Sequence, residues 1–211
     1  MARRTKEEAQ ATRARLLDCA ETLFQAQGVS RTSLHDIAQA AGATRGAVYW
    51  HFKDKADLFN AMLERVTLPM ESALLSGPPT CADPLAHVRG SVLDALGRIA
   101  NDAQTRRVFD VITHKVEYIS ELNAVRDRHL AARGRCLDRM AGDLRAAARL
   151  RGQRLPVPAA TAAQGLLALI DGLIQNWLLE PGAFDLVATG RRALDTYAKG
   201  LGLGPAGRNG G

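Results

Sequence analysis

Residues 42–55 run Gly42-Ala-Thr-Arg-Gly-Ala-Val-Tyr-Trp-His-Phe-Lys-Asp-Lys55, and this stretch decides how the chain is interpreted. Val48 and Phe52 have the spacing of a buried helical stripe. Neighbouring residues on a helix point about 100° apart, so positions 49–51, two aromatics and a histidine, cannot all face a core. The aromatic pair is therefore predicted to face solvent or a partner. Basic residues on both sides favour a partner that carries phosphate.

The segments before this stretch give the spacing of a helix-turn-helix. Apolar residues recur with helical period over 7–27 and 34–41, and again over 45–51. Gly28 and Gly42 stand just past the first two helices, as helix-ending glycines do. A short second helix, a turn of about three residues and a short third helix make a helix-turn-helix. The third helix is then expected to enter a major groove.

The third helix and its N-terminal cap carry the predicted DNA contacts. Thr44, Arg45 and Gly46 lie at its start, where Arg45 can reach a guanine edge and Gly46 lets the backbone approach the DNA. A small helical hairpin with a basic rim is the alternative. The residues placed for phosphates and sugars are Tyr49, Trp50, His51 and Lys55.

A family resemblance strengthens the DNA hypothesis. Residues 31–59, from Arg31-Thr-Ser-Leu-His-Asp-Ile-Ala to Lys-Ala-Asp-Leu-Phe59, closely resemble the DNA-binding signature of TetR-family transcriptional repressors. The first ten residues resemble the AcrR type, which represses multidrug efflux pumps. Ala43 departs from the valine of many relatives, at a core-side position where little effect is expected. The resemblance implies these DNA-facing positions: Ser33, Thr44, Arg45, Tyr49, Trp50, His51 and Lys55.

Composition sets wider limits. The chain has 211 residues, is 46% hydrophobic and carries a net charge of +6, which suits a globular protein with an anionic partner. Cys19, Cys81 and Cys136 are odd in number and far apart, so neither disulfides, a structural metal nor a cofactor is expected. The chain lacks a run of 18 apolar residues and a secretory leader. We therefore expect a cytoplasmic protein without a membrane partner.

Helical periodicity continues through the rest of the chain. Pro69 should kink or end the fourth helix near Leu68. The basic loop over 149–158 is interpreted as solvated, with a second DNA surface as the alternative, and the arm over 1–6 as frayed or reaching along DNA. The further helices are expected over about 57–68, 83–102, 104–115, 117–151, 159–180 and 185–201.

Two of these helices need finer interpretation. In the helix over 104–115, Val108, Phe109 and Ile112 are expected to face inward. In the long helix over 117–151 the inward stripe includes His129, and the charged residues are expected to form a solvated face. A loop over 78–84 and a disordered tail over 205–211 are also expected.

The predicted fold is all-α, with about nine helices. A three-helix DNA-binding domain over 1–55 precedes a ligand-binding and dimerisation domain over 56–204. The helix over 159–180 is apolar on nearly all sides and needs partners on more than one side. With the last helix it can form a four-helix interface with a second copy.

Asp171 lies within this most apolar helix. A lone buried carboxylate is costly unless it is paired or hydrated. It is either a structural acid, bonded for instance to His114 or Arg139, or a polar anchor in an apolar cavity. The resemblance extends to residues 113–118 and 171–181. It implies a cavity lined by Val66, Val92, Leu96, Ile99, Phe109, Thr113, Cys136, Met140, Leu167, Ile170, Asp171 and Ile174.

These observations favour a dimeric, ligand-responsive repressor. It would bind a palindromic operator and be released by a hydrophobic small molecule, with a multidrug efflux operon as the target implied by resemblance. A metabolic or stress operon is the alternative. Asp110, His114 and Glu117 could share a helix face, but no nucleophile motif, phosphate loop or third metal ligand accompanies them. An enzyme is therefore not expected. A purely architectural DNA-binding protein would not need so many apolar helices beyond the head.

Overall fold

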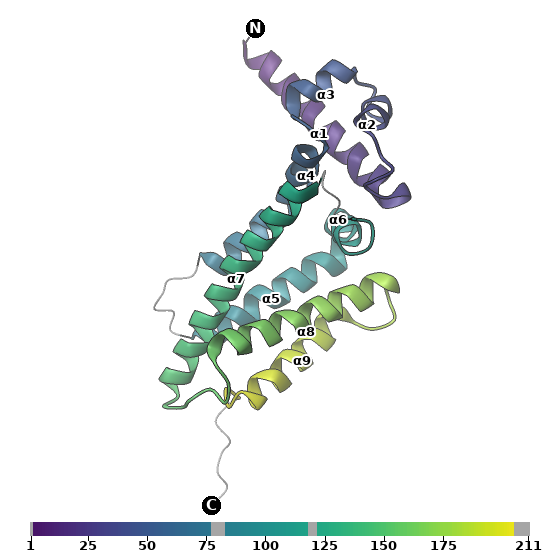
Figure 1. Ribbon diagram of the computed structural model, residues 1–211. Helices are drawn as coiled ribbons and strands as arrows, with labels where there is room; N and C mark the ends of the chain where they lie inside the picture. The colour runs from purple at the N-terminus through teal and green to yellow at the C-terminus, as the bar shows by residue number, and fades with distance from the viewer. Residues whose placement is uncertain (1, 77–82, 118–121, 205–211) are drawn as a thin grey trace, which may run out of the picture. The chain divides into compact units, whose positions relative to one another are not determined.

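The computed structural model describes residues 2–76, 83–117 and 122–204, with the side chains of 2–5 left aside. Over this part the chain is all-α and holds nine helices and no strand, so the predicted fold class is confirmed (Figure 1). None of these helices is long and apolar enough to cross a bilayer. Cys81, most of the loop expected over 78–84, and the tail over 205–211 lie outside the described residues.

The helices follow the predicted order along the chain. Their bounds are α1 Ala2–Gln27, α2 Leu34–Ala40, α3 Arg45–His51, α4 Lys55–Leu75, α5 Pro84–Asn101, α6 Ala103–His114, α7 Asn123–Leu150, α8 Ala159–Leu179 and α9 Leu186–Gly200 (Figure 1).

The chain forms two compact units. Unit 1 comprises Met1–Leu68 and Ala103–Leu130, and unit 2 comprises Pro69–Asp102 and Ala131–Gly211. The chain crosses between the units three times: within α4 after Leu68, between α5 and α6 after Asp102, and within α7 after Leu130. The domain division inferred from the sequence, at residue 55, stays a prediction.

Unit 1 is built on α1, which packs against α2, α3 and α6. Phe24 of α1 and Phe59 of α4 are fully buried, with ring centroids 5.6 Å apart. Gly28 ends α1 with a φ of 85°, a conformation that suits glycine. The Val29 backbone N–H then donates to the Lys115 carbonyl at 3.1 Å, which ties the end of α1 to the end of α6.

A buried carboxylate lies at the contact of α1 with α6. Glu21 is 2% exposed and accepts a hydrogen bond from the Gln104 amide at 2.9 Å. Arg65 and Arg107 lie 3.5 and 3.8 Å from its carboxylate oxygens. Burial raises the pKa of Glu21, and the hydrogen bond and the two arginines oppose that rise.

Three helices differ from the sequence prediction at their ends. α7, which was expected to start at about residue 117, begins at Asn123, and Glu117 is not helical. α1 begins at Ala2, so the segment expected as a frayed or extended arm is helical from that residue onward. α4 runs through Pro69 to Leu75, so of the two predicted outcomes the ending near Leu68 is wrong, and a kink at Pro69 stays a prediction. Proline lacks the N–H that would donate to the Arg65 carbonyl, so α4 lacks one backbone hydrogen bond. This gap lies beside the boundary between the units, which falls after Leu68.

Unit 2 is built on α5, α8 and α9. Asp83 caps α5 by accepting from the Ala86 N–H at 3.1 Å. α9 packs against α5, and Gly190 lies against the Leu96 side chain, where a larger residue would clash. α9 also packs on α8, where the Tyr197 hydroxyl donates to the Ala162 carbonyl at 2.8 Å. Burial raises the pKa of Tyr197.

Burial within α6 and α7 was only partly predicted. In α6 the buried residues are Thr105, Val108 and Val111, whereas Phe109 and Ile112 are half-buried. In α7, His129 is exposed rather than inward.

The expected solvated face of α7 also contains a buried acid, Asp143, at 6% exposure. It accepts from Arg139 Nε at 2.9 Å, and His87 Nδ1 lies 3.0 Å from the same oxygen. The prediction failed here because α5 supplies the partner that makes burial of this charge tolerable.

Candidate nucleic-acid interface

The start of α2 is held by a reciprocal cap. The Ser33 hydroxyl accepts from the Asp36 N–H at 3.1 Å, and the Ser33 N–H donates to the Asp36 carboxylate at 2.9 Å. The Ser33 N–H, and secondly the Ser33 hydroxyl, donate to the Asp36 carboxylate and lower its pKa. The same hydroxyl donates to Asp36 at 2.8 Å, so Ser33 is exposed but its hydroxyl is engaged in the cap.

A tight turn orients α3 against α2. Gly42 adopts a φ of 60°, and the Ala43 N–H donates to the Ala38 carbonyl at 2.9 Å. Thr44 then caps α3, because its hydroxyl accepts from the Ala47 N–H at 3.2 Å. The predicted bounds of α3 match the structure to the residue.

α3 buries one face and presents the other. Val48 is fully buried and Phe52, which follows the helix, is 2% exposed. Trp50 is 73% exposed and Tyr49 is 48% exposed. Large exposed apolar side chains that lie beside cations indicate an interaction surface.

The predicted contact residues at the start of α3 lie on its exposed side. Thr44, Arg45 and Gly46 are all exposed, and the Arg45 guanidinium lies over the Tyr49 ring, 5.6 Å from its centroid. Such stacking restrains the arginine and leaves its nitrogen atoms available for planar acceptors. The exposed side of α3 therefore carries a cation, Arg45, an aromatic ring, Tyr49, and the accessible backbone of Gly46.

His51 closes α3 beside Trp50, with ring centroids 4.5 Å apart in an edge-on arrangement. Burial, and secondly the charge of Arg13, lower the pKa of His51. In the free protein both effects favour the neutral imidazole, which can still donate a hydrogen bond from a ring N–H.

Lys55 is the one predicted contact residue that the structure buries, at 8% exposure. Its ammonium donates to the carbonyls of Val29 and Thr32, at 3.3 and 3.4 Å. These carbonyls belong to the turn between α1 and α2. Lys55 thus ties the start of α4 to that turn, whereas the sequence suggested a phosphate contact.

A surface depression of about 470 Å³ joins these elements. It brings together four predicted residues, Ser33, Arg45, Tyr49 and Lys55, and it is also lined by residues that the sequence interpretation left out. The further polar residues are Ser30, Arg31, Thr32, His35, Lys53 and Asp54. The sequence did contain a signal for this cluster. Basic residues stand before α2, at the start of α3 and just after α3, at positions 31, 45 and 53.

The residues predicted to line an inducer cavity belong to both units. Val66, Phe109 and Thr113 are in unit 1, and the other nine are in unit 2. In unit 2, Val92, Leu96 and Ile99 are buried on one face of α5, and Ile170 and Ile174 are buried on one face of α8. A cavity formed by these residues stays a prediction.

Asp171 does not meet the expectation that it is buried. It is exposed on α8, so the burial cost that suggested a polar anchor does not arise within one chain. The two suggested partners are engaged elsewhere. Arg139 bonds Asp143, and His114 Nδ1 lies 3.0 Å from Asp110.

In the alternative catalytic set, Asp110 and His114 are paired at 3.0 Å on one face of α6, whereas Glu117 bonds elsewhere. Asp110 also accepts from Gln25 at 3.2 Å, and Glu117 accepts from Ser30 at 3.3 Å. Each contact joins α6 or its end to α1 or the turn after it. Among the residues described, no three His, Cys, Asp or Glu side chains are grouped to hold a metal ion.

Two family models match the chain. The model of bacterial regulatory proteins of the tetR family matches residues 16–62, which include α2 and α3. The model of the C-terminal region of MAATS-type transcriptional repressors matches residues 83–202. The family resemblance noted in the sequence is thereby confirmed.

Similar proteins support the same assignment over nearly the whole chain. The transcriptional regulator TtgR of Pseudomonas putida is 40% identical over 209 residues, which cover 98% of this chain and 99% of TtgR. The structure of NalD, the secondary repressor of the MexAB-OprM multidrug efflux pump in Pseudomonas aeruginosa, has a TM-score of 0.83 and 36% identity, and the match covers 92% of this chain and 98% of NalD.

A further similar structure contains a ligand. SmeT, the repressor of the Stenotrophomonas maltophilia multidrug efflux pump SmeDEF, has been solved in complex with triclosan. That structure has a TM-score of 0.78 and 33% identity, and the match covers 90% of each chain.

Proposed function

Because the chain belongs to the TetR family of bacterial transcriptional regulators, we propose that it is a dimeric repressor released from a palindromic operator by a hydrophobic small molecule. We further infer that the operator controls a multidrug efflux operon, since NalD and SmeT repress genes of such pumps. As a bacterial operator-binding protein it would act in the cytoplasm.

The exposed face of α3 is the observation that carries the DNA proposal. Trp50 and Tyr49 are exposed beside Arg45, while Val48 anchors the opposite face in the core. This arrangement suits a recognition helix, whose first residues meet base edges while its flanks meet the backbone. In this proposal Arg45 reads a base, Thr44 and Gly46 allow close approach, and Tyr49, Trp50 and His51 contact phosphates and sugars.

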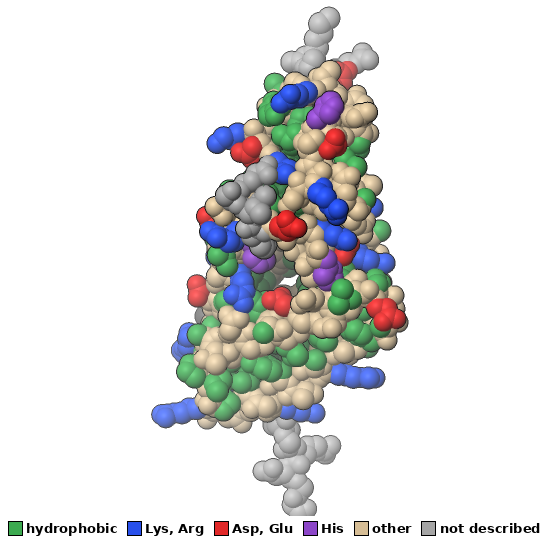
Figure 2. Space-filling view, turned by 45° about the vertical axis from the view of Figure 1, so that its right-hand side comes forward, with side chains coloured by type: hydrophobic (Ala, Val, Ile, Leu, Met, Phe, Trp, Pro, Cys, Tyr) green, Lys and Arg blue, Asp and Glu red, His purple; other side chains and the backbone are tan. Residues whose placement is uncertain are grey.

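The proposed dimer surface is the outer face of α8 and α9. Figure 2 shows a band of hydrophobic side chains across the lower part of the view, where these helices lie. Leu169 lines two neighbouring depressions on this face, of about 900 and 380 Å³, together with Val157 and Leu173. A second copy would cover this surface by isologous packing. The two recognition helices would then read half-sites roughly 34–36 Å apart.

Inducer release follows from differential affinity for two conformations. A ligand lowers operator occupancy only if it binds the DNA-incompetent conformation more tightly. Moving the protein from 99% to 1% of the DNA-competent state needs a preference of about 5.5 kcal/mol. The inward faces of α5 and α8 are aliphatic, which supports a hydrophobic inducer, and triclosan bound to SmeT is a ligand of that class.

The proposal is tested by fluorescence anisotropy on the intergenic DNA upstream of the gene. The full chain should bind one region of this DNA tightly, and triclosan should release it. Trp50→Ala should weaken binding about ten-fold or more, since truncating a tryptophan that becomes buried in an interface typically costs about 2 kcal/mol or more. Leu130→Ala, which removes an exposed apolar residue of α7, should leave binding unchanged.

Two results would overturn parts of the proposal. Equal effects of Trp50→Ala and Leu130→Ala would remove α3 from the interface. Operator binding upstream of a metabolic or stress operon, with no pump gene in either direction, would contradict efflux control and leave the repressor assignment intact.

A further inference from the structure

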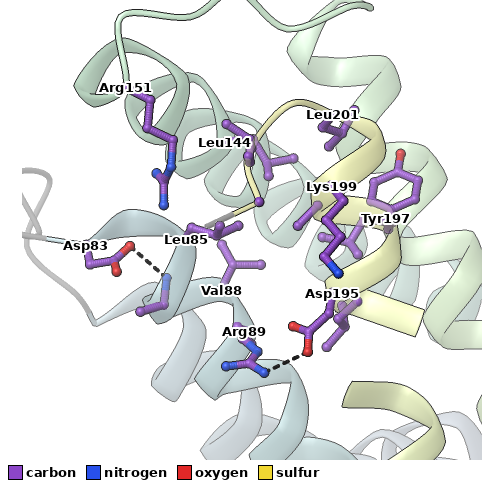
Figure 3. Close-up of a pocket in the computed structure, with 16 residues that line it drawn as sticks. Asp83, Leu85, Val88, Arg89, Leu144, Arg151, Asp195, Tyr197, Lys199 and Leu201 are labelled. Atoms are coloured by element: carbon purple, nitrogen blue, oxygen red, sulfur yellow. Dashed lines mark hydrogen bonds and ion pairs between the residues drawn. The ribbon is translucent and has the colours of Figure 1, made fainter. Parts of the chain in front are cut away.

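Unit 2 contains a cavity that the proposed function does not use. Its volume is about 420 Å³, and it lies between the start of α5, the end of α7 and the end of α9 (Figure 3). This volume falls within the range of about 300–1,000 Å³ that small-molecule sites occupy. None of the residues predicted for the inducer cavity lines it. It therefore represents a separate candidate binding site.

The floor of the cavity is aliphatic. Val88, Leu144 and Leu166 line it and are at most 3% exposed, so they form part of the fixed core of unit 2. Leu85 and Leu201 extend the apolar surface toward the mouth. A floor of this composition binds a hydrocarbon or aromatic body by burial of apolar area.

The acids of the cavity wall already have partners. Asp195 accepts from Arg89 at 3.0 Å, and Asp83 accepts from the first turn of α5. The Nε of Arg89 is buried without a hydrogen-bond partner among the described residues. Arg89 is nevertheless engaged in the wall itself, and its ion pair with Asp195 leaves the anchoring of a ligand to other side chains.

Two further cations reach the cavity from opposite walls. Figure 3 shows Arg151 extending from the end of α7 and Lys199 from α9, with Leu85 and Val88 between them. One guanidinium nitrogen of Arg151 donates to the Ala147 carbonyl at 3.2 Å. The side chain of Lys199 is exposed, and its ammonium has no hydrogen-bond or ion-pair partner among the described residues. The cavity is lined by three cations, Arg89, Arg151 and Lys199, against the two carboxylates of Asp83 and Asp195, so its charge is positive by one.

We propose that this cavity binds an amphipathic carboxylate of the fatty-acid type, for which decanoate is a suitable probe. The hydrocarbon lies on the aliphatic floor, and the carboxylate lies between Arg151 and Lys199. A cationic amphiphile would meet both charges with like sign. A neutral alcohol would gain the apolar contacts but leave the charge-assisted hydrogen bonds unmade.

Calorimetric titration of the full chain with decanoate tests the site. The double variant Arg151→Gln/Lys199→Gln should lose about ten-fold or more in decanoate affinity, because two charge-assisted hydrogen bonds are removed. Its affinity for decanol should change less than about two-fold. The control Arg149→Gln/Arg154→Gln removes two nearby exposed charges that do not line the cavity, and it should bind decanoate like the wild type.

Photolabelling locates the bound molecule. A diazirine derivative of decanoate should label peptides covering 83–89 and 194–204. Labels confined to Val92, Leu96 or Ile170 would place the carboxylate in the predicted inducer cavity and overturn the proposal. Equal loss of affinity in the two double variants would also overturn it, since it would show a general charge effect. Neither readout involves DNA, so failure of the operator proposal would leave this test unaffected.

Discussion

At the scale of single residues, two cations that are close in the sequence, Arg45 of α3 and Lys55 of α4, have opposite environments. Arg45 is exposed and stacks on Tyr49, which keeps the guanidinium extended toward a partner. Lys55 is buried and spends its ammonium on two backbone carbonyls. Arg45 is therefore available to a DNA partner, whereas Lys55 stabilises the turn between α1 and α2.

Arg45→Ala is expected to reduce selectivity between the operator and a scrambled sequence by about 1–3 kcal/mol, the discrimination of one bidentate base contact. Stability should change by less than about 0.5 kcal/mol, since the residue is exposed. Competition binding with both DNA sequences measures the effect. Arg31→Ala, in the same depression, is the control and should weaken both complexes equally. Unchanged selectivity in Arg45→Ala would exclude it from base readout.

Lys55→Met is expected to destabilise the fold by about 1–3 kcal/mol, because it removes the ammonium that donates to the Thr32 carbonyl and leaves the Val29 carbonyl with the Thr32 N–H alone. The slope of log affinity against log salt should stay unchanged. Lys53→Met, an exposed neighbour in the same depression, should instead lower that slope by about 0.9, as loss of one phosphate contact does. Urea denaturation and salt titration test the pair. A reduced slope in Lys55→Met would restore the phosphate role suggested by the sequence.

At the scale of elements, polar clusters join helices that are far apart in the sequence. Glu21 connects α1 with α6 through Gln104, and it also faces Arg65 of α4. Asp143 of α7 joins His87 of α5 in the same way. Such clusters fix the register of neighbouring helices because each buried charge requires its particular partners.

Glu21→Gln is expected to become more stabilising, relative to the wild type, as the pH rises from about 4 to 7. The pKa of Glu21 is raised by burial, so its contribution is fully present below the unfolded pKa and is lost as the pH rises through the folded pKa. Glutamine keeps the hydrogen-bonding shape and does not ionise. Urea denaturation at several pH values measures the difference. A difference that shrinks with rising pH would show that the two arginines outweigh burial.

The elements themselves were largely readable from sequence, whereas the polar contacts between them were not. Ser33, Gly42 and Thr44 carry local cap and turn chemistry, so the bounds of α3 were predicted to the residue. Pro69 misled the prediction of the end of α4, because the helix continues past it to Leu75 despite one lost backbone bond. The burial of Asp143 and the exposure of Asp171 depend on helices distant in sequence, which periodicity within one helix does not reveal.

At the scale of the whole molecule, the proposed function rests on two copies of the chain. The outer face of α8 and α9 is apolar around Leu169, and one copy alone leaves it in water. Two weak half-site contacts become one strong complex when a dimer links them, because the second contact forms at high effective concentration. Operator affinity is therefore expected to follow dimer stability.

Leu169→Glu is expected to shift the protein toward monomer and to weaken operator binding at least ten-fold, because a charge on the buried interface is costly. Leu150→Glu, which places the same charge on an exposed residue of α7, should leave both unchanged. Light scattering and anisotropy measure the two properties. A Leu169→Glu protein that stays dimeric would place the interface elsewhere.

The boundaries of the two units inside α4 and α7 constrain how hybrid regulators can be engineered from this chain. A single crossover after Leu68 would separate α1 from its native α6, which returns to unit 1 through residues 103–130. The Val29–Lys115 and Gln25–Asp110 bonds would then join segments of different parentage. A chimera that borrows a foreign operator specificity should therefore exchange both segments together, with three junctions instead of one.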